Sequence, residues 1–228
     1  MNIFIIVAHP DDEVFGCGGT IAKYRKGNDI YVAILGEGIS SRYKKRKEAK
    51  EEISKLKEDS IKAGKLLGIK RTFFFGLPDN CFDTVSFLEI VKKIEEIIKK
   101  IKPEVVYTHY SGDLNIDHRI TFQAVLTATR PVKGCPVKEI YSFEVPSSTE
   151  WSFGKIEKEK VFNPNVFEDI SDTLGIKLKA LRLYKSEIRK FPHPRSLKTI
   201  RAIAVRWGSV AGLKYAEAFE LVRKIIDK

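Results

Sequence analysis

The chain has 228 residues, of which 43% are hydrophobic, and a formal net charge of +11 at pH 7. This length suits one α/β domain over residues 1–228, and the hydrophobic fraction is enough for a sizeable core. No apolar run approaches the ~20 residues of a membrane span, and no signal-peptide pattern follows Met1. Three scattered cysteines without a CxxC pair indicate a reducing compartment, so we expect a soluble, cytoplasmic protein.

The positive charge does not by itself indicate a nucleic-acid-binding protein. Lysines are spread over several predicted helices and alternate with glutamates, as over residues 44–52. Such mixed runs are typical of solvated helix faces. The sequence also contains no zinc-finger, RNP or KH pattern. We therefore expect no nucleic-acid partner.

The first two thirds of the chain alternate between strand-like apolar runs and segments of helical periodicity. Strands are predicted over residues 2–7, 29–35, 71–75, 105–109 and 139–144. Helices are predicted over residues 13–26, 43–67, 87–101 and 118–129. This alternation predicts a mostly parallel, doubly wound sheet of order 3-2-1-4-5, with helices on both faces.

The rest of the chain has a different pattern. Residues 151–166 are expected to be irregular, with room for a hairpin. Helical spacing predicts helices over residues 170–189 and 197–227. Two prolines exclude a helix between them, over residues 191–196. The predicted fold is thus an α/β three-layer sandwich with a C-terminal helical extension.

A histidine and three carboxylates follow the first predicted strand: His9, Asp11, Asp12 and Glu13. In open α/β folds, ligands bind at this edge of the sheet. A turn stiffened by Pro10 can aim His9 and Asp12 at one point, and imidazole plus carboxylate is a good Zn²⁺ ligand pair. Asp11 then remains free to act on a metal-bound water. Capping of the helix that follows would explain one or two of the acidic residues, but it would not explain the histidine at position 9.

A second polar cluster follows the fourth predicted strand and contains two of the four histidines. In the order 3-2-1-4-5 the first and fourth strands are neighbours, so their exit loops would bring His118 to His9 and Asp12. Two histidines and one aspartate with an open position form a catalytic zinc arrangement. His109 is interpreted as a contact behind the ligands or, with slight preference, as a hydrogen-bonded strand-end residue. Asp117 either orients a neighbouring group or caps the helix.

These two clusters, AHPDDE at residues 8–13 and DLNIDHR at residues 113–119, resemble the LmbE/PIG-L family of zinc-dependent N-acetylglucosamine deacetylases. Similar motifs follow at residues 191–196 and 215–219. The resemblance implies a Rossmann-like fold and a homo-oligomer, with hexamers among the family's assemblies. It also implies zinc ligands at His9, Asp12 and His118 and a general base at Asp11.

The resemblance extends to substrate contacts, with one departure. Arg42 and Asp79, in the loops after the second and third strands, match substrate-contacting positions; their plainer interpretations are a surface charge and a turn residue. Asn115 stands where many members have a histidine, and asparagine cannot donate a proton near neutral pH. The general acid is then Asp11 after it takes a proton, or a histidine such as His193, which also suits an ordinary surface loop or a subunit contact. Asn115 and His193 are counted with Arg42 and Asp79 as predicted substrate-binding residues.

The predicted reaction is hydrolysis of an N-acetyl group on an amino sugar or sugar conjugate. Zn²⁺ is the expected cofactor, although Fe²⁺ and Co²⁺ also accept two histidines and an aspartate. One alternative is a zinc hydrolase of another amide, and a less favoured one is a basic, non-enzymatic binding protein with this fold. The glycines at residues 16–19 do not have nucleotide-binding GxGxxG spacing and are expected to allow close helix–sheet packing.

Overall fold

The structure is a computed structural model and describes residues 1–156 and 161–226. Within these ranges one sheet holds seven strands in the order β3-β2-β1-β4-β5-β7-β6. They are β1 (Asn2–Val7), β2 (Asp29–Gly36), β3 (Arg71–Leu77), β4 (Val105–His109), β5 (Glu139–Phe143), β6 (Val166–Asp169) and β7 (Ala216–Lys224). The first five strands in this order are parallel, and β7 pairs antiparallel with both β5 and β6. The predicted order 3-2-1-4-5 is confirmed, and two further strands extend it.

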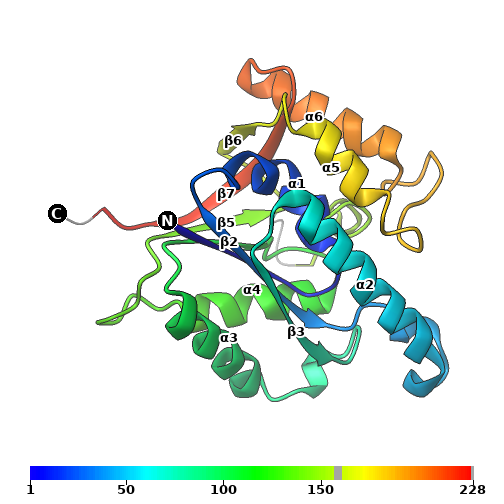
Figure 1. Cartoon of the computed structure of the whole chain (residues 1–228), viewed down its shortest axis with the longest axis vertical. Coiled ribbons are helices and arrows are strands. Elements are labelled where there is room, and N and C mark those ends of the chain that lie inside the picture. The colour runs from blue at the N-terminus through cyan, green and yellow to red at the C-terminus, as the bar shows by residue number, and fades with distance from the viewer. Residues whose placement is uncertain (157–160, 227–228) are drawn as a thin grey trace.

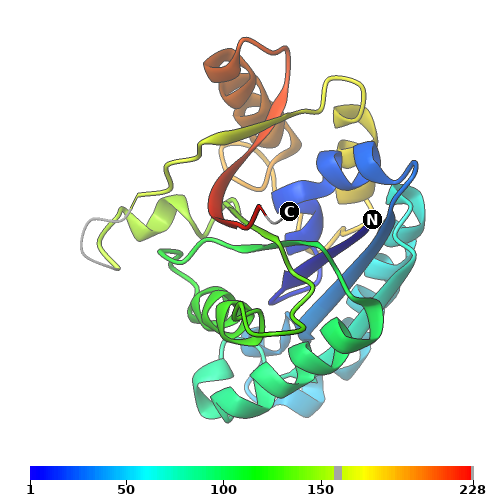
Figure 2. The same ribbon diagram turned by 90° about the vertical axis from the view of Figure 1, so that its left-hand side faces the viewer.

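Helices cover both faces of this sheet (Figures 1 and 2). One layer contains α1 (Asp12–Tyr24), α2 (Lys50–Leu67), α5 (Leu174–Leu181) and α6 (Leu197–Ala211), and the other contains α3 (Phe87–Ile101) and α4 (Ile116–Ala128). Along β1, Ile3 and Ile5 pack into the first layer, whereas Phe4 and Ile6 pack into the second. This two-sided burial explains why β1 is apolar throughout. No helix in the described ranges is long and apolar enough to cross a membrane.

Two predicted helices are shorter in the structure. The α-helical part of the predicted segment 43–67 begins only at Lys50, because two 3₁₀ turns, Ser40–Arg42 and Arg46–Ala49, occupy the approach. The predicted helix 170–189 is helical only over Leu174–Leu181. Beyond it, turns carry Tyr184 and Glu187 into the interior. Tertiary burial of these two side chains has overridden the local helical pattern.

The prediction of a helix over residues 197–227 is wrong beyond Ala211, and residue 227 lies outside the described ranges. α6 ends at Gly212, whose φ is 70°, and β7 follows. Ala218 packs against the cluster around Trp207, while Phe219 enters the main core. A strand buried on both faces lacks the alternation that distinguishes it from a helix. The C-terminal extension therefore adds two strands to the sheet as well as two helices.

β6 falls at the end of the segment expected to be irregular, and it pairs with β7 rather than forming a local hairpin. The part of that segment at residues 157–160 lies outside the described ranges. Pairing with β7 joins positions about fifty residues apart, such as Val166 and Phe219. This contact is set by tertiary packing.

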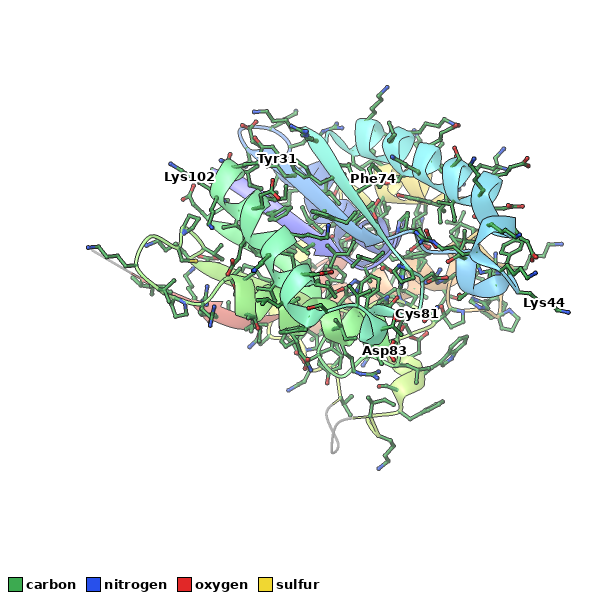
Figure 3. All side chains as sticks on the ribbon, turned by 90° about the horizontal axis from the view of Figure 1, so that it is seen from below. Tyr31, Lys44, Phe74, Cys81, Asp83 and Lys102 are labelled. Carbon is green, nitrogen blue, oxygen red and sulfur yellow. The ribbon has the colours of Figure 1, made fainter. Side chains whose placement is uncertain are left out.

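The carboxyl ends of the parallel strands meet at one edge of the sheet, and the predicted site residues other than His193 follow the ends of β1 to β4. Figure 3 labels Cys81 and Asp83 in the loop after β3, far from Lys102, which follows α3 at the opposite edge. The loop after β3 also contains Asp79, so this segment lies at the same edge as the turn after β1.

Candidate active site

The turn after β1 holds Asp11 in an unusual backbone conformation. Its φ is 105°, in the left-handed region that costs a non-glycine residue of order 1–3 kcal/mol. Glu13 Oε2 accepts a hydrogen bond from the Asp11 N–H at 3.0 Å. The Asp11 carbonyl accepts hydrogen bonds from Val14 and Phe15 at the start of α1. These bonds offset the strain and determine where the Asp11 side chain lies.

His9, Asp12 and His118 converge on one point. His9 lies in the turn after β1, Asp12 begins α1, and His118 lies in the first turn of α4. The strands that precede them, β1 and β4, are parallel neighbours. His9 Nδ1 and His118 Nε2 lie 3.5 and 3.4 Å from the same atom, Asp12 Oδ2. One ligand atom from each of the three residues lies within 4.8 Å of the other two. The structure thus brings together the three residues predicted to bind a metal.

The other ring nitrogen of each histidine faces a carboxylate. His9 Nε2 lies 3.0 Å from Asp117 Oδ2 and 3.2 Å from Asp79 Oδ1. His118 Nδ1 lies 3.3 Å from Asp113 Oδ2. Carboxylates behind metal-binding histidines fix the ring orientation and the tautomer. Asp117 thus contacts a predicted ligand, which is the first of the two roles considered for it.

His9, Asp79 and Asp117 form a second group that could hold an ion. The carboxylates of Asp79 and Asp117 already accept hydrogen bonds from backbone N–H groups. In contrast, Asp12 Oδ1 is buried and has no hydrogen-bond partner among the described residues. Because an unsatisfied buried acceptor is costly, a cation between His9, Asp12 and His118 would relieve that cost. The first group therefore fits a divalent cation better than the second.

The local electrostatics also favour a cation. Burial by itself lowers the pKa of both histidines, but the surrounding carboxylates outweigh it, raising the pKa of His118 to about 9 and that of His9 well above its usual range. Burial opposes ionisation of Asp12, but the positive charge of His118 and its hydrogen bond hold the pKa of Asp12 well below its usual range. This pocket stabilises positive charge, which a divalent metal ion carries.

His109 lies behind these residues at the end of β4. Its ring stacks on that of His118, with the centroids 3.9 Å apart and 15° between the planes. Its Nε2 accepts a hydrogen bond from the Ala8 N–H at 2.8 Å. Burial and the neighbouring His118 lower its pKa. Both predicted interpretations describe its position in the structure, because His109 is a hydrogen-bonded residue at the end of β4 and also contacts His118 from behind.

A cleft of about 230 Å³ opens over this group, and Asp11 forms part of its wall. Its wall also contains the four residues predicted to contact substrate: Arg42, Asp79, Asn115 and His193. Asp79 Oδ2 accepts hydrogen bonds from Ser41, and Asn115 Nδ2 donates to Asn80 Oδ1 at 3.1 Å. Six of the eight predicted site residues thus line one cleft: His9, Asp11, Arg42, Asp79, Asn115 and His193. The other two, Asp12 and His118, are buried beside His9.

Two cleft residues, Glu187 and Arg195, were not identified from the sequence. Glu187 accepts hydrogen bonds from both terminal nitrogens of Arg42, at 3.0 and 2.6 Å. Arg195 Nη1 lies 3.0 Å from Asp11 Oδ2 and 3.1 Å from Glu187 Oε2. Arg195 falls inside the motif at residues 191–196, but nothing in the sequence pairs it with Asp11, 184 residues away.

The pKa values of two neighbouring carboxyl groups, on Asp11 and Glu13, are raised. Burial raises the pKa of Asp11 well above its usual range, although the positive charge of Arg195 opposes this shift. Burial also raises the pKa of Glu13 to about 7, against the hydrogen bond from Tyr184. A carboxyl group whose pKa is shifted toward neutrality can take up and release a proton near the working pH of an enzyme.

Comparison with known proteins identifies deacetylases as similar to this chain. The chain is 27% identical to a diacetylchitobiose deacetylase of Thermococcus kodakarensis, over 97% of this chain and 83% of the relative. It is 30% identical to the uncharacterized deacetylase YaiS of Escherichia coli K12, over 81% of this chain and 91% of the relative. The crystal structure of an N,N'-diacetylchitobiose deacetylase from Pyrococcus horikoshii shares the fold, with a TM-score of 0.76, 20% identity and coverage of 97% and 84% of the two chains.

The family follows from the sequence that carries the site. The profile of the family described as GlcNAc-PI de-N-acetylase matches residues 4–129, which is more than half of the chain. The matched part runs from β1 to the end of α4, so it includes both loops that hold His9, Asp12 and His118. The chain therefore belongs to the PIG-L/LmbE family, as its two polar motifs predicted.

Proposed function

We propose that this protein is a metal-dependent hydrolase that removes the N-acetyl group from an N-acetylated amino sugar or sugar conjugate. One observation carries the proposal: Asp11 stands beside the His9, Asp12 and His118 group and on the wall of the same cleft. The names of the relatives support amino sugars as the substrate class, since two of them are diacetylchitobiose deacetylases.

His9, Asp12 and His118 would hold the metal ion, and the donor set suits Zn²⁺, Fe²⁺ or Co²⁺. Bound there, such an ion would lower the pKa of a water to about 7 and would polarise the amide carbonyl. Asp11 takes a proton from the water as the water oxygen bonds to the carbonyl carbon. It returns that proton to the amide nitrogen as the C–N bond breaks. One water is consumed, and acetate and the free amine are released.

Asp11 is assigned both proton-transfer roles because Asn115 cannot carry a proton. The Asn115 side chain instead orders the loop, since its Oδ1 accepts a hydrogen bond from the Asp117 N–H at 2.8 Å. His193 Nδ1 accepts a hydrogen bond from the Arg195 N–H at 3.1 Å, which places the proton of a neutral ring on Nε2. His193 can therefore donate to a sugar hydroxyl from the cleft wall.

Arg42 and Asp79 are proposed to grip the sugar ring or its substituent from the side of the cleft formed by the loops after β2 and β3. Both are polar and face the cleft, and Arg42 keeps a partly exposed guanidinium although it pairs with Glu187. Hydrolysis of a different amide would use the same chemistry with different contacts at these positions. A binding protein without activity would retain the cleft but release no acetate.

The experiment is to measure metal content and acetate release for the wild type, Asp11→Asn and the control Asp83→Asn. Asp83 is an exposed carboxylate near the same edge of the sheet but outside the cleft wall. The substrates are N-acetylglucosamine, diacetylchitobiose and further N-acetylated sugar conjugates. We expect one metal ion per chain in all three proteins, and kcat about 10²–10⁴-fold lower for Asp11→Asn alone.

Metal bound without acetate release from any substrate would overturn the amino-sugar assignment and favour another amide. A protein that binds no metal and releases no acetate would overturn the hydrolase and favour a binding protein. We also propose a homo-oligomer on the basis of the family, which light scattering coupled to size-exclusion chromatography tests directly.

A further inference from the structure

Arg195 reaches the cleft from the loop before α6 and is anchored on several sides. Its Nε donates to Ser147 Oγ at 2.9 Å and to the Pro146 carbonyl at 3.3 Å. The guanidinium carbon lies 5.0 Å from the centre of the Phe15 ring. Only 18% of the side chain is exposed. The guanidinium group therefore has a defined position that packing and hydrogen bonds hold in place.

From this position Arg195 contacts the proposed general base. Its Nη1 lies 3.0 Å from Asp11 Oδ2, a distance typical of a charge-assisted hydrogen bond. No described residue donates a hydrogen bond to the other oxygen, Asp11 Oδ1. One oxygen of Asp11 is thus held, while the other remains available on the wall of the cleft.

The geometry points to Arg195 as the positioning residue of the proposed deacetylase: it holds Asp11 through Oδ2 and leaves Oδ1 free for the proton of the attacking water. This inference rests on the proposed function, since it assumes that Asp11 is the general base. It assigns to Arg195 no contact with the metal ion and no proton transfer.

Repulsion explains why Asp11 requires such a partner. The neighbouring side chains of Asp12, Glu13 and Glu187 are also acidic and buried. Without a cation, their charges would push the Asp11 carboxylate out of place. A misplacement of about 1 Å can cost a factor of 10² in rate, because proton transfer needs a hydrogen-bond distance.

Glu187 links this contact to the opposite wall of the cleft. Its Oε2 accepts from Arg195 Nη1 at 3.1 Å and from Arg42 Nη2 at 2.6 Å. Two arginines from distant segments therefore share one buried carboxylate. A lysine at position 195 would supply the charge but not the planar fork that reaches Asp11, Glu187 and Ser147 together.

The first test compares Arg195→Gln and Arg195→Lys with the wild type. The control is Arg201→Gln. Arg201 is exposed on α6, donates a hydrogen bond to the Tyr215 hydroxyl and is not in the cleft wall. For Arg195→Gln we expect kcat to fall about 10²-fold, with KM within threefold and metal content unchanged. Arg195→Lys should recover part of the loss, and the control should match the wild type. Equal kcat values for all four proteins would overturn the inference.

The second test separates positioning from a general structural role. Methylguanidinium added to Arg195→Gly should raise the kcat of this variant at least tenfold, whereas it should not change the kcat of the wild type. If Arg195→Gly does not fold, Arg195→Lys replaces it. The kcat and the crystal structure of Arg195→Lys then test the positioning role. Lost activity that methylguanidinium does not restore would overturn the positioning role.

Crystal structures of the wild type and Arg195→Lys give a readout that does not depend on activity. We expect the Asp11 carboxylate to move or to occupy more than one rotamer in the variant. An unmoved Asp11 would overturn the inference even if the wild-type protein proved active. Absence of acetate release in the wild type would instead overturn the proposed function, so the two failures can be told apart.

Discussion

Lys177 Nζ lies 2.6 Å from Glu217 Oε1, and both side chains are buried between α1, α5 and β7. Glu217 also accepts hydrogen bonds from the N–H groups of Gly19 and Thr20, at 2.8 and 2.7 Å. These N–H groups follow Cys17, where α1 departs from helical geometry with a φ of −142°. Glu217 therefore caps the second half of α1 and joins the C-terminal strand to the helix that starts in the active site.

Breaking this buried pair should destabilise the protein. Lys177→Met leaves the Glu217 charge buried without its partner, so we expect the free energy of unfolding to fall by about 3–5 kcal/mol in urea denaturation. The control is Glu96→Gln, because the Glu96–Lys100 pair is fully on the surface and should leave the midpoint unchanged. A Lys177→Met midpoint equal to that of the wild type would contradict this account.

Asp113 should control metal affinity without binding the metal. Its Oδ2 faces His118 Nδ1 at 3.3 Å, and Asp113→Asn removes the charge while nearly preserving the side-chain volume. Loss of such a carboxylate typically weakens metal binding by about 10–100-fold. Competition with a fluorescent chelator measures the change, and Asp83→Asn is again the control. Unchanged affinity in Asp113→Asn would show that the His118 ring is oriented by other contacts.

Replacement by alanine should change the free energy of unfolding in opposite directions at two glycines. A Cβ at Gly16 would lie 2.2 Å from Phe143 Cδ2, so Gly16→Ala should lower the free energy of unfolding by about 1–3 kcal/mol. A Cβ at Gly175, within α5, would meet no atom within 4 Å, so Gly175→Ala should raise it by about 0.5–1 kcal/mol. Urea denaturation of both variants checks the signs. Equal effects would contradict the close packing of Gly16 against the sheet.

Glu187 should contribute stability that is lost in acid. Burial raises its pKa, but Arg42 and Arg195 outweigh burial and hold the pKa below its ordinary value. A depressed pKa means that the folded state favours the ionised form, so this stability is present above the unfolded-state pKa and is lost as the pH falls through the lowered value.

The variant Glu187→Gln isolates this contribution. The wild type should be more stable than the variant by about 2 kcal/mol at pH 7, since each bond to a charged partner is worth about 1.5–3 kcal/mol. This difference should narrow as the pH falls below about 4.3, the usual pKa of an unfolded glutamate. Urea denaturation at several pH values measures it. A difference that stays constant down to the lowest pH would contradict the assignment.

Sequence alone was sufficient for the five parallel strands and for the proximity of the three candidate metal ligands. Strands buried on both faces appear as continuous apolar runs, and the alternation with helices restricts their order to very few topologies. Because His9 and Asp12 share one turn, their proximity is local. His118 was predicted to lie near them because β1 and β4 are neighbours in the predicted strand order. The structure confirms that order.

Tertiary structure decided the C-terminal strands and the wall of the cleft. β7 is covered on both faces, so its apolar residues suited a helix as well as a strand until its pairing with β5 was known. Arg195 meets Asp11 across 184 residues, and Glu187 meets Arg42 across 145. Contacts between loops depend on how distant elements pack, and no local periodicity encodes that packing. The residue types for the chemistry were therefore readable from the sequence, whereas the partner that holds Asp11 in place was not.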